Sequence, residues 1–196
     1  YWLKARHYCS LFYRAMGDEH ARRLATKQDD VYVYSFNWGH EEVSSETHAF
    51  TFGACHCIDL PFIFGCVDKT ESWRQFSPMF KSFTETNRPG RLALSEAMVS
   101  YLRQFLRTGN PNNAVSGLPE WKAWSNHVGG PKAFQLDADL KQAQIAMDTR
   151  ELSIAGVRYA LDAEPPDLRK HVLAIASVIQ PFVVYESGDY QFSSKR

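Results

Sequence analysis

Apolar positions are nearly continuous over residues 31–38, where β-branched and aromatic side chains dominate the run VYVYSFNW. Such a run predicts a β-strand that is covered on both faces. A strand of this kind needs a neighbouring strand on each side, and little else in the chain supplies them all. The pattern therefore indicates that strands outside these 196 residues complete the sheet.

Other segments repeat apolar residues at the spacing of a helix. The range Tyr1–Met16 predicts an amphipathic helix, with Gly17 as its stop and Asp18 as the cap of a second short helix. Its apolar positions are Tyr8, Leu11, Phe12, Ala15 and Met16. The range Leu92–Thr108 predicts a longer helix that ends at Gly109. Its expected buried residues are Met98, Tyr101, Leu102, Phe105 and Leu106.

The segments between these helices are shorter. Residues 39–50 are expected to form a polar connection, and residues 70–83 a helical aromatic stripe that is broken near Pro78. The stripe consists of Trp73, Phe76, Phe80 and Phe83. Residues 87–90 predict a turn because Asn, Pro and Gly occur together there. Residues 132–137 and 144–147 are candidate strands of one hairpin.

The end of the chain carries two further apolar stripes. Ile154, Val157 and Leu161 form the first stripe. After the break at residues 165–166, the second stripe consists of Leu168, Val172, Ile175 and Ile179. Both predict amphipathic helices, and residues 188–196 are expected to form an exposed end. Docking of these helices on the parent domain is the simplest expectation. The alternatives are a homo-oligomer contact through residues 150–180 and a cover over the pocket.

One histidine stands in an unusual setting within residues 53–65, GACHCIDLPFIFG. Small residues surround His56, and an aromatic and aliphatic block follows it and ends at Gly65. Small residues allow a tight turn that passes close to another element. The pattern predicts a turn that presents His56 at the edge of a pocket and is fixed by the apolar residues behind it. Imidazole is the side chain best suited to proton transfer near neutral pH.

The pattern Gly-Ala-x-His-x-x-acid-Leu-Pro-Phe-x-Phe-Gly resembles the histidine segment of the type-B carboxylesterases, the cholinesterase-like branch of the α/β-hydrolases. Two flanking segments, residues 31–38 and 101–112, agree with that family in order and spacing. The resemblance covers about residues 1–147. It implies an α/β fold, namely the C-terminal part of an α/β-hydrolase, mostly helical and containing the last core strands.

The resemblance also implies hydrolysis of small-molecule carboxylic esters by a serine-histidine-acid triad, with His56 as the catalytic histidine and no cofactor or metal. In α/β-hydrolases the triad follows the chain order serine, acid, histidine. The sequence contains no Gly-x-Ser-x-Gly segment. The serine and the acid are therefore expected on an N-terminal portion of the same enzyme, and this chain alone is expected to be inactive.

Two positions beside the histidine depart from the family pattern. Cys57 stands where a small residue such as glycine is usual, and Asp59 stands where many members have glutamate. The first is expected to restrict the backbone of the turn, and the second to alter a supporting hydrogen bond. Neither change removes the proton-transfer group. Asp59 is not assigned as the triad acid, because the family places that acid upstream.

Two other function classes remain open on the sequence alone. Some cholinesterase-like proteins keep the fold as an interaction module and lose triad members. A zinc-binding module is the other, because Cys55, His56, Cys57 and Cys66 are all side chains that zinc accepts. However, three adjacent ligands do not readily converge on one tetrahedral ion.

Composition limits the binding partners and the cellular compartment that we expect for the protein. The 22 basic and 22 acidic residues cancel, so nothing in the net charge favours nucleic acid or an anionic membrane. No apolar run approaches the roughly 18 residues that a membrane span requires. The four cysteines, Cys9, Cys55, Cys57 and Cys66, do not form a disulfide framework for a protein of this size. Free thiols favour a reducing, cytoplasmic compartment.

The domain organisation follows from the extent of the resemblance. Residues 1–147 are expected to form the C-terminal part of the α/β-hydrolase domain and to carry the histidine loop. Residues 148–196 are expected to form a C-terminal helical extension and tail.

Overall fold

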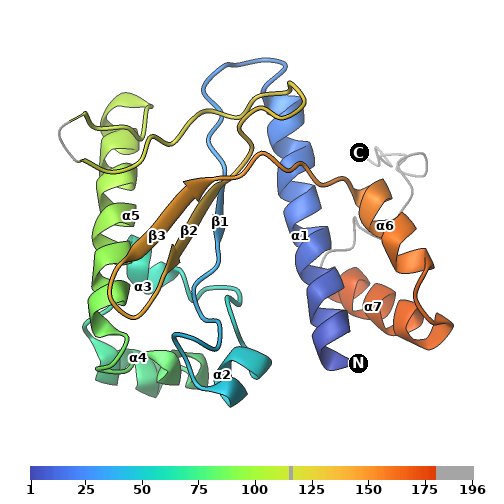
Figure 1. The fold of residues 1–196 in the computed structure, drawn as a ribbon, viewed down its shortest axis with the longest axis horizontal. Helices are drawn as coiled ribbons and strands as arrows, with labels where there is room; N and C mark the ends of the chain where they lie inside the picture. Colours follow the sequence, from blue (N-terminus) through green and yellow to red (C-terminus); the bar gives the residue numbers. More distant parts are fainter. Residues whose placement is uncertain (115–116, 180–196) are drawn as a thin grey trace, which may run out of the picture. The chain divides into compact units, whose positions relative to one another are not determined.

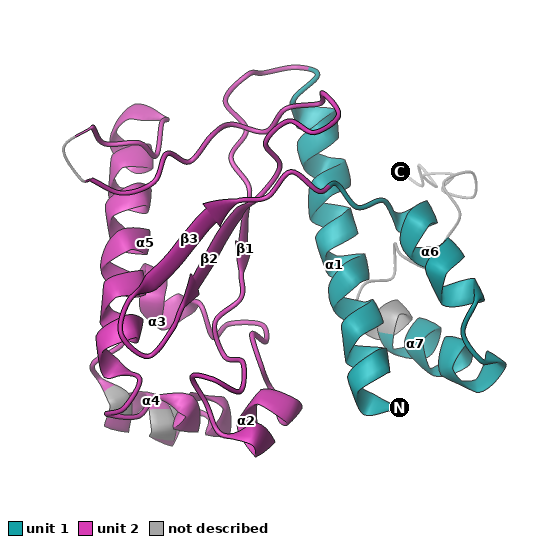
Figure 2. Ribbon diagram, in the orientation of Figure 1, with its two compact units in different colours: residues 1–26, 151–196 teal, residues 27–150 magenta. Residues whose placement is uncertain are grey.

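The computed structural model describes residues 1–114 and 117–179 and divides into two compact units (Figure 2). One unit combines residues 1–26 with the chain from residue 151 onward, and the other comprises residues 27–150. These units are defined by how compactly the chain folds and not by similarity to a family. The sequence-based boundary between residues 147 and 148 concerned the family domain and stays a prediction.

The first unit is helical. It consists of α1 (Trp2–Leu24), α6 (Ile154–Asp162) and α7 (Pro166–Ile179), and α1 contacts both of the other helices (Figure 1). The buried residues of its core are Ala5, Tyr8, Phe12, Ala15, Val157, Leu161, Leu168 and Val172. The Ile179 side chain and the predicted exposed end at residues 188–196 lie outside what the structure describes. The first apolar stripe and Leu168, Val172 and Ile175 of the second are confirmed as helix faces. Because they pack on α1 of the same chain, a subunit contact through residues 150–180 stays a prediction.

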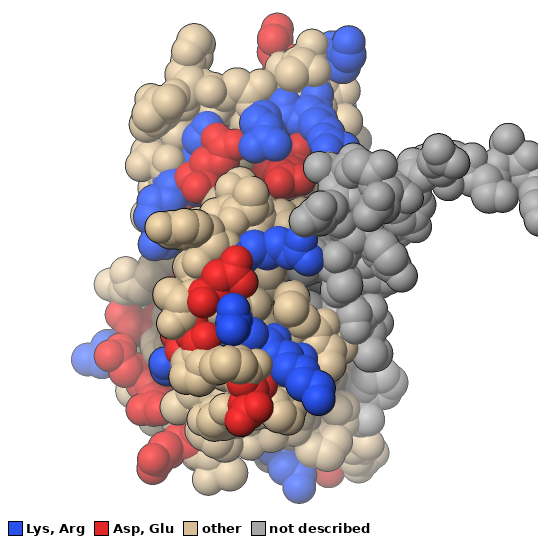
Figure 3. All heavy atoms as spheres, turned by 90° about the vertical axis from the view of Figure 1, so that its right-hand side faces the viewer, with Lys and Arg blue, Asp and Glu red and all other residues tan. Residues whose placement is uncertain are grey.

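Polar contacts join α1 to the segment around α6. Lys4 pairs with Glu164 at 2.7 Å, and Arg22 pairs with Glu151 at 3.0 Å. The hydrogen bond to Lys4 holds the pKa of Glu164 below its ordinary value, and burial raises the pKa of the neighbouring Tyr8. On the face drawn in Figure 3, acidic and basic side chains of the described residues are intermixed, which agrees with the balanced charge.

The predicted break at Gly17 is wrong, because α1 continues through it. Asp18 is fully buried and does not cap a second helix. Its carboxylate accepts hydrogen bonds from Arg14 Nε at 2.7 Å and from the backbone N–H of Leu152 at 2.9 Å. Glycine inside a helix costs only about 1 kcal/mol, so it does not by itself end one. Here the contact of Asp18 with Leu152 supports the helix beyond Gly17.

The second unit contains a three-stranded sheet with the order β1-β2-β3. The strands are β1 (Tyr34–Phe36), β2 (Phe134–Ala138) and β3 (Ala143–Met147). β1 runs parallel to β2, and β2 pairs antiparallel with β3 in a register that places Leu136 opposite Ile145. The predicted hairpin is confirmed.

β1 is shorter than the predicted strand over residues 31–38. Only three residues form the ladder, although Phe134 N–H also donates to Val33 O and Asn37 N–H donates to Leu136 O. Within the described residues, β1 has a neighbour on one side alone, and Tyr34 is 40% exposed. The expected second neighbour of this strand stays a prediction.

The helices of this unit are α2 (Glu46–Thr51), α3 (Leu60–Ile63), α4 (Thr70–Phe76), the 3-10 helix η1 (Pro78–Ser82) and α5 (Arg88–Thr108). The predicted break near Pro78 is confirmed, and Trp73, Phe80 and Phe83 join the core, while the Phe76 side chain lies outside what is described. The connection at 39–50 was predicted without a helix. It contains α2 because the Ser45 side chain accepts from His48 N–H and caps it.

The predicted turn at residues 87–90 is wrong, since Asn87 is the N-cap residue of α5. Proline is well tolerated in the first turn of a helix, where its missing N–H needs no partner. Pro89 therefore lies within the first turn of α5, after Arg88, and does not precede the helix. The predicted end of the helix is confirmed, because Gly109 takes a left-handed conformation with φ of 76°.

The buried face of α5 is narrower than predicted. Met98 and Tyr101 are buried, whereas Leu102, Phe105 and Leu106 are 37%, 40% and 75% exposed. The helix packs on α3, β2 and β3. None of the helices in the described ranges has both the length and the apolar character needed to cross a bilayer.

The start of α5 is built around a buried amide. Asn87 is fully buried, and its Nδ2 donates to Val43 O at 2.6 Å and to Ser82 O at 2.7 Å. Its Oδ1 accepts from the backbone N–H of Thr84 and from the guanidinium of Arg91. This one side chain therefore joins the loop after β1, η1 and α5.

Two glycines in helices predict opposite responses to alanine. A Cβ at Gly90 would lie 1.8 Å from the backbone oxygen of Asp139, whereas a Cβ at Gly17 would meet nothing within 4 Å. Gly90→Ala is expected to lower the free energy of unfolding by about 1–3 kcal/mol, because the turn between β2 and β3 must move away. Gly17→Ala is expected to raise it by about 0.5–1 kcal/mol. Urea unfolding measures both, and equal effects of the two variants would contradict the close contact at Gly90.

Asp18 supplies a second test. Asp18→Ala removes the buried acceptor of Arg14 and of the Leu152 N–H, so the free energy of unfolding is expected to fall by about 2–4 kcal/mol. The matched control is Asp162→Ala, because the Asp162 side chain is 73% exposed and contacts Arg169 only at 3.7 Å. Surface pairs of this kind contribute about 0–1 kcal/mol. A loss for Asp18→Ala no larger than for the control, measured in urea, would refute the structural role of Asp18.

Candidate active site

His56 lies in a tight turn between α2 and α3. The backbone N–H of Ile58 donates to Cys55 O, and that of Leu60 donates to Cys57 O, each at 3.2 Å. Ile58 and Phe62 are fully buried behind the turn, whereas the His56 side chain is exposed. The apolar residues that follow the histidine therefore fix the turn on the core and leave the imidazole at the surface.

The imidazole of His56 is accessible to a partner from outside the described residues. The described part of the chain gives this ring neither a hydrogen bond nor an ion pair. Asp59 is the nearest acid in the sequence, and its carboxylate accepts a hydrogen bond from Tyr34 Oη at 3.0 Å. Asp59 thus connects the start of α3 to β1. The expected effect of aspartate in place of glutamate on a supporting hydrogen bond stays a prediction.

Cys57 adopts a backbone conformation that favours glycine. Its φ is 70°, and it is the single non-glycine residue with positive φ in the described ranges. A left-handed conformation costs an L-residue roughly 1–2 kcal/mol. The turn beside His56 is therefore strained at the position where the family usually has a small residue.

Two glycine backbones touch beside this turn. A Cβ on Gly39 would lie 2.6 Å from Gly53 O, and both glycines have positive φ, 123° and 53°. Gly39 begins the loop after β1, and Gly53 begins the segment that carries His56. The two loops approach this closely because neither glycine has a side chain.

The neighbouring pair of His40 and Asp137 has no counterpart in the sequence-based predictions. His40 Nε2 lies 3.4 Å from Asp137 Oδ1, with the two side chains 37% and 26% exposed. Burial raises the pKa of Asp137, while the Ala138 N–H and His40 counteract this rise. The two residues are far apart in the chain, so no local pattern connects them. The pairing of β1 with β2 brings them together.

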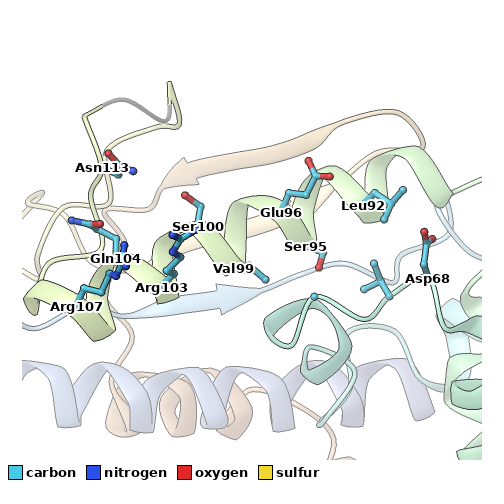
Figure 4. Close-up of a pocket in the computed structure, with 12 residues that line it drawn as sticks. Asp68, Leu92, Ser95, Glu96, Val99, Ser100, Arg103, Gln104, Arg107 and Asn113 are labelled. Carbon is cyan, nitrogen blue, oxygen red and sulfur yellow. The ribbon is translucent and has the colours of Figure 1, made fainter.

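A surface pocket of about 550 Å³ lies along α5 (Figure 4). Arg103, Arg107 and Gln104 lie toward one end of it, and Glu96 and Asp68 lie toward the other. Gly65, Val67 and Asp68 contribute part of its wall, but His56 is not among its lining residues. The pocket and the histidine turn are thus formed by different residues.

The zinc alternative finds no support in the described residues. All four cysteines are free thiols, and burial raises the pKa of Cys9. Across residues 1–114 and 117–179, no group of three or more His, Cys, Asp and Glu side chains is arranged to hold a metal ion.

The strain at Cys57 yields a testable prediction. Cys57→Gly is expected to raise the free energy of unfolding by about 1 kcal/mol, because glycine adopts positive φ without steric cost. Cys55→Gly is the matched control, since Cys55 does not have positive φ. Glycine there adds flexibility and removes a side chain that packs against the core. The free energy of unfolding of the control is expected to fall by about 0.5–1 kcal/mol. Urea unfolding measures both variants. An equal fall in the free energy of unfolding of the two would show that the turn is not strained at Cys57.

The sequence matches the model of the Carboxylesterase family over residues 8–154, which is most of the chain. A comparison with curated proteins found no match. The family match confirms the resemblance to type-B carboxylesterases. The helices and the small mixed sheet are compatible with part of the α/β-hydrolase fold that the family implies. On this evidence, the chain belongs to the Carboxylesterase family.

Proposed function

We propose that this chain supplies the catalytic histidine, His56, of a serine carboxylesterase. The observation that carries the proposal is the exposed imidazole on a turn that buried apolar residues hold in place, within a chain of the Carboxylesterase family. Ester hydrolysis is the general activity of this family. The finer assignment of the triad rests on the position of His56 within the family motif.

The proposed mechanism divides hydrolysis into two proton-transfer cycles at His56. In the first, the imidazole takes the proton of a serine hydroxyl as its oxygen attacks the ester carbonyl. The protonated ring then gives that proton to the leaving alcohol, and an acyl-serine remains. In the second cycle, the ring activates a water molecule, and the carboxylic acid is released with the serine restored.

The serine and the acid are proposed to lie on polypeptide outside the 196 residues. No Gly-x-Ser-x-Gly segment occurs in the sequence, and Asp59 is hydrogen-bonded to Tyr34. An exposed ring without a partner in the described residues is suited to receive both groups from another part of the enzyme. The substrates are proposed to be small-molecule carboxylic esters, and the reaction needs no cofactor.

The test uses the full-length polypeptide that contains this chain. It is expected to hydrolyse p-nitrophenyl esters and to lose this activity after treatment with an organophosphate. His56→Ala is expected to reduce kcat by about 10²–10⁴-fold, because general acid-base catalysis contributes that much. His127→Ala is the matched control, since His127 is exposed on another loop, and it is expected to leave kcat unchanged.

Each outcome has a distinct meaning. The isolated 196-residue chain is expected to hydrolyse nothing, and activity in it would show that the nucleophile has been misplaced. Full activity of the His56→Ala variant would refute the role of His56. A full-length polypeptide that neither reacts with the organophosphate nor hydrolyses esters would instead be a non-catalytic interaction module of the family.

A further inference from the structure

The pair of His40 and Asp137 lies where two parallel strands end. β1 and β2 run in the same direction, so their carboxyl ends meet at one edge of the sheet. Asp137 is near the end of β2, and His40 follows β1 in the next loop. The distance of 3.4 Å between His40 Nε2 and Asp137 Oδ1 thus connects the loop after β1 to β2.

The same loop touches the segment that carries His56. Gly39, next to His40, packs against the backbone of Gly53 so closely that a Cβ would lie 2.6 Å from Gly53 O. Packed backbone segments with so little space transmit displacement, since protein interiors are close-packed. A shift of Gly39 therefore requires a shift of Gly53, three positions before His56.

Other contacts hold the loop on either side of this point. Asn37 N–H donates to Leu136 O at 2.9 Å, and Trp38 is fully buried. Further along, Val43 is buried, and its carbonyl accepts from Asn87 Nδ2 at 2.6 Å. Gly39 lies between these anchors and, as a glycine, has the greatest backbone freedom. The carbonyl of His40 also accepts from the N–H groups of Val43 and Ser44, at 3.2 Å and 3.1 Å. The His40 side chain adds the contact that connects this stretch to β2.

The surroundings of Asp137 act on its carboxylate in opposite directions. Glu42, on the same loop, repels Asp137, whereas His40 attracts it. Burial disfavours the charged form of Asp137, and the Ala138 N–H at 2.8 Å supports that form. Without His40, the carboxylate would keep the repulsion of Glu42 and lose its attraction to the loop.

We propose that His40 and Asp137 form a positioning pair that holds Gly39 against Gly53 and thereby orients the turn of His56. The pair touches neither substrate nor the reacting atoms. It acts through the backbone contact between the two glycines. Its catalytic consequence rests on the proposed function, whereas its structural consequence does not.

The first experiment needs no activity. The imidazole nitrogen signals of His56 are recorded by NMR in the 196-residue chain and in His40→Ala, Asp137→Asn and the double variant. Each single variant is expected to shift the His56 signals, and the double variant is expected to shift them no further, because both changes remove one interaction. His40→Gln, which keeps a hydrogen-bond donor, is expected to restore most of the original signals. His127→Ala is the control and is expected to leave them in place.

The second experiment measures kinetics in the full-length polypeptide. His40→Ala is expected to reduce kcat about tenfold, since small misplacements of catalytic groups cost about this much or more, and to leave KM within about twofold. His40→Gln is expected to recover most of the lost kcat. A loss through general destabilisation would instead lower the melting temperature, and the conservative variant would not rescue it selectively.

Different results would overturn the positioning pair and the proposed esterase function. Unchanged His56 signals in His40→Ala and Asp137→Asn would overturn the positioning pair, whatever the activity of the enzyme. Shifted signals with no ester hydrolysis in the full-length polypeptide would retain the pair and refute the proposed function. Shifts that add up in the double variant would show that the two residues act independently, which also overturns the pair.

Discussion

The packing of three aromatic rings is the constraint on which the candidate site depends. The ring centroids of Trp38 and Phe62 are 5.2 Å apart, those of Trp38 and Phe83 are 5.5 Å apart, and all three side chains are fully buried. Burying one such side chain contributes about 1.5–3 kcal/mol, and each aromatic pair adds about 0.5–1.5 kcal/mol. Trp38 ends the segment that contains β1, and Phe62 belongs to α3. The cluster therefore fixes the loop after β1 and the turn of His56 on the same core.

The polar features of the site lie on this apolar base. Asp59, on the histidine segment, accepts a hydrogen bond from Tyr34 of β1. His40, on the loop whose Gly39 packs on Gly53, contacts Asp137 of β2. A few kilocalories per mole from the core are enough to maintain one residue in an unfavourable conformation, which costs roughly 1–2 kcal/mol at Cys57. The exposed imidazole is thus held by buried groups that take no part in proton transfer.

The parts of the fold that follow from local pattern were predictable from the sequence. The hairpin of β2 and β3, the end of α5 at Gly109 and the two helices at the end of the chain all follow from periodicity and turn residues. The predicted helix end at Gly17 and cap at Asp18 were wrong, because one partner of the buried Asp18 is the backbone N–H of Leu152, 134 residues away. The start of α5 at Asn87 and the pair of His40 and Asp137 likewise depend on partners distant in the chain. Position 56 stood out only through the motif around it, since neither exposure nor ring partners can be read from a sequence.

The central claim is that His56 meets a serine hydroxyl supplied by polypeptide outside this chain. The most direct measurement is an experimental structure of the full-length polypeptide, in which the distance from a His56 ring nitrogen to the nearest serine Oγ is determined. The account predicts a distance of about 2.6–3.2 Å, with a carboxylate at the other ring nitrogen. A His56 ring with no serine within hydrogen-bond reach would contradict it.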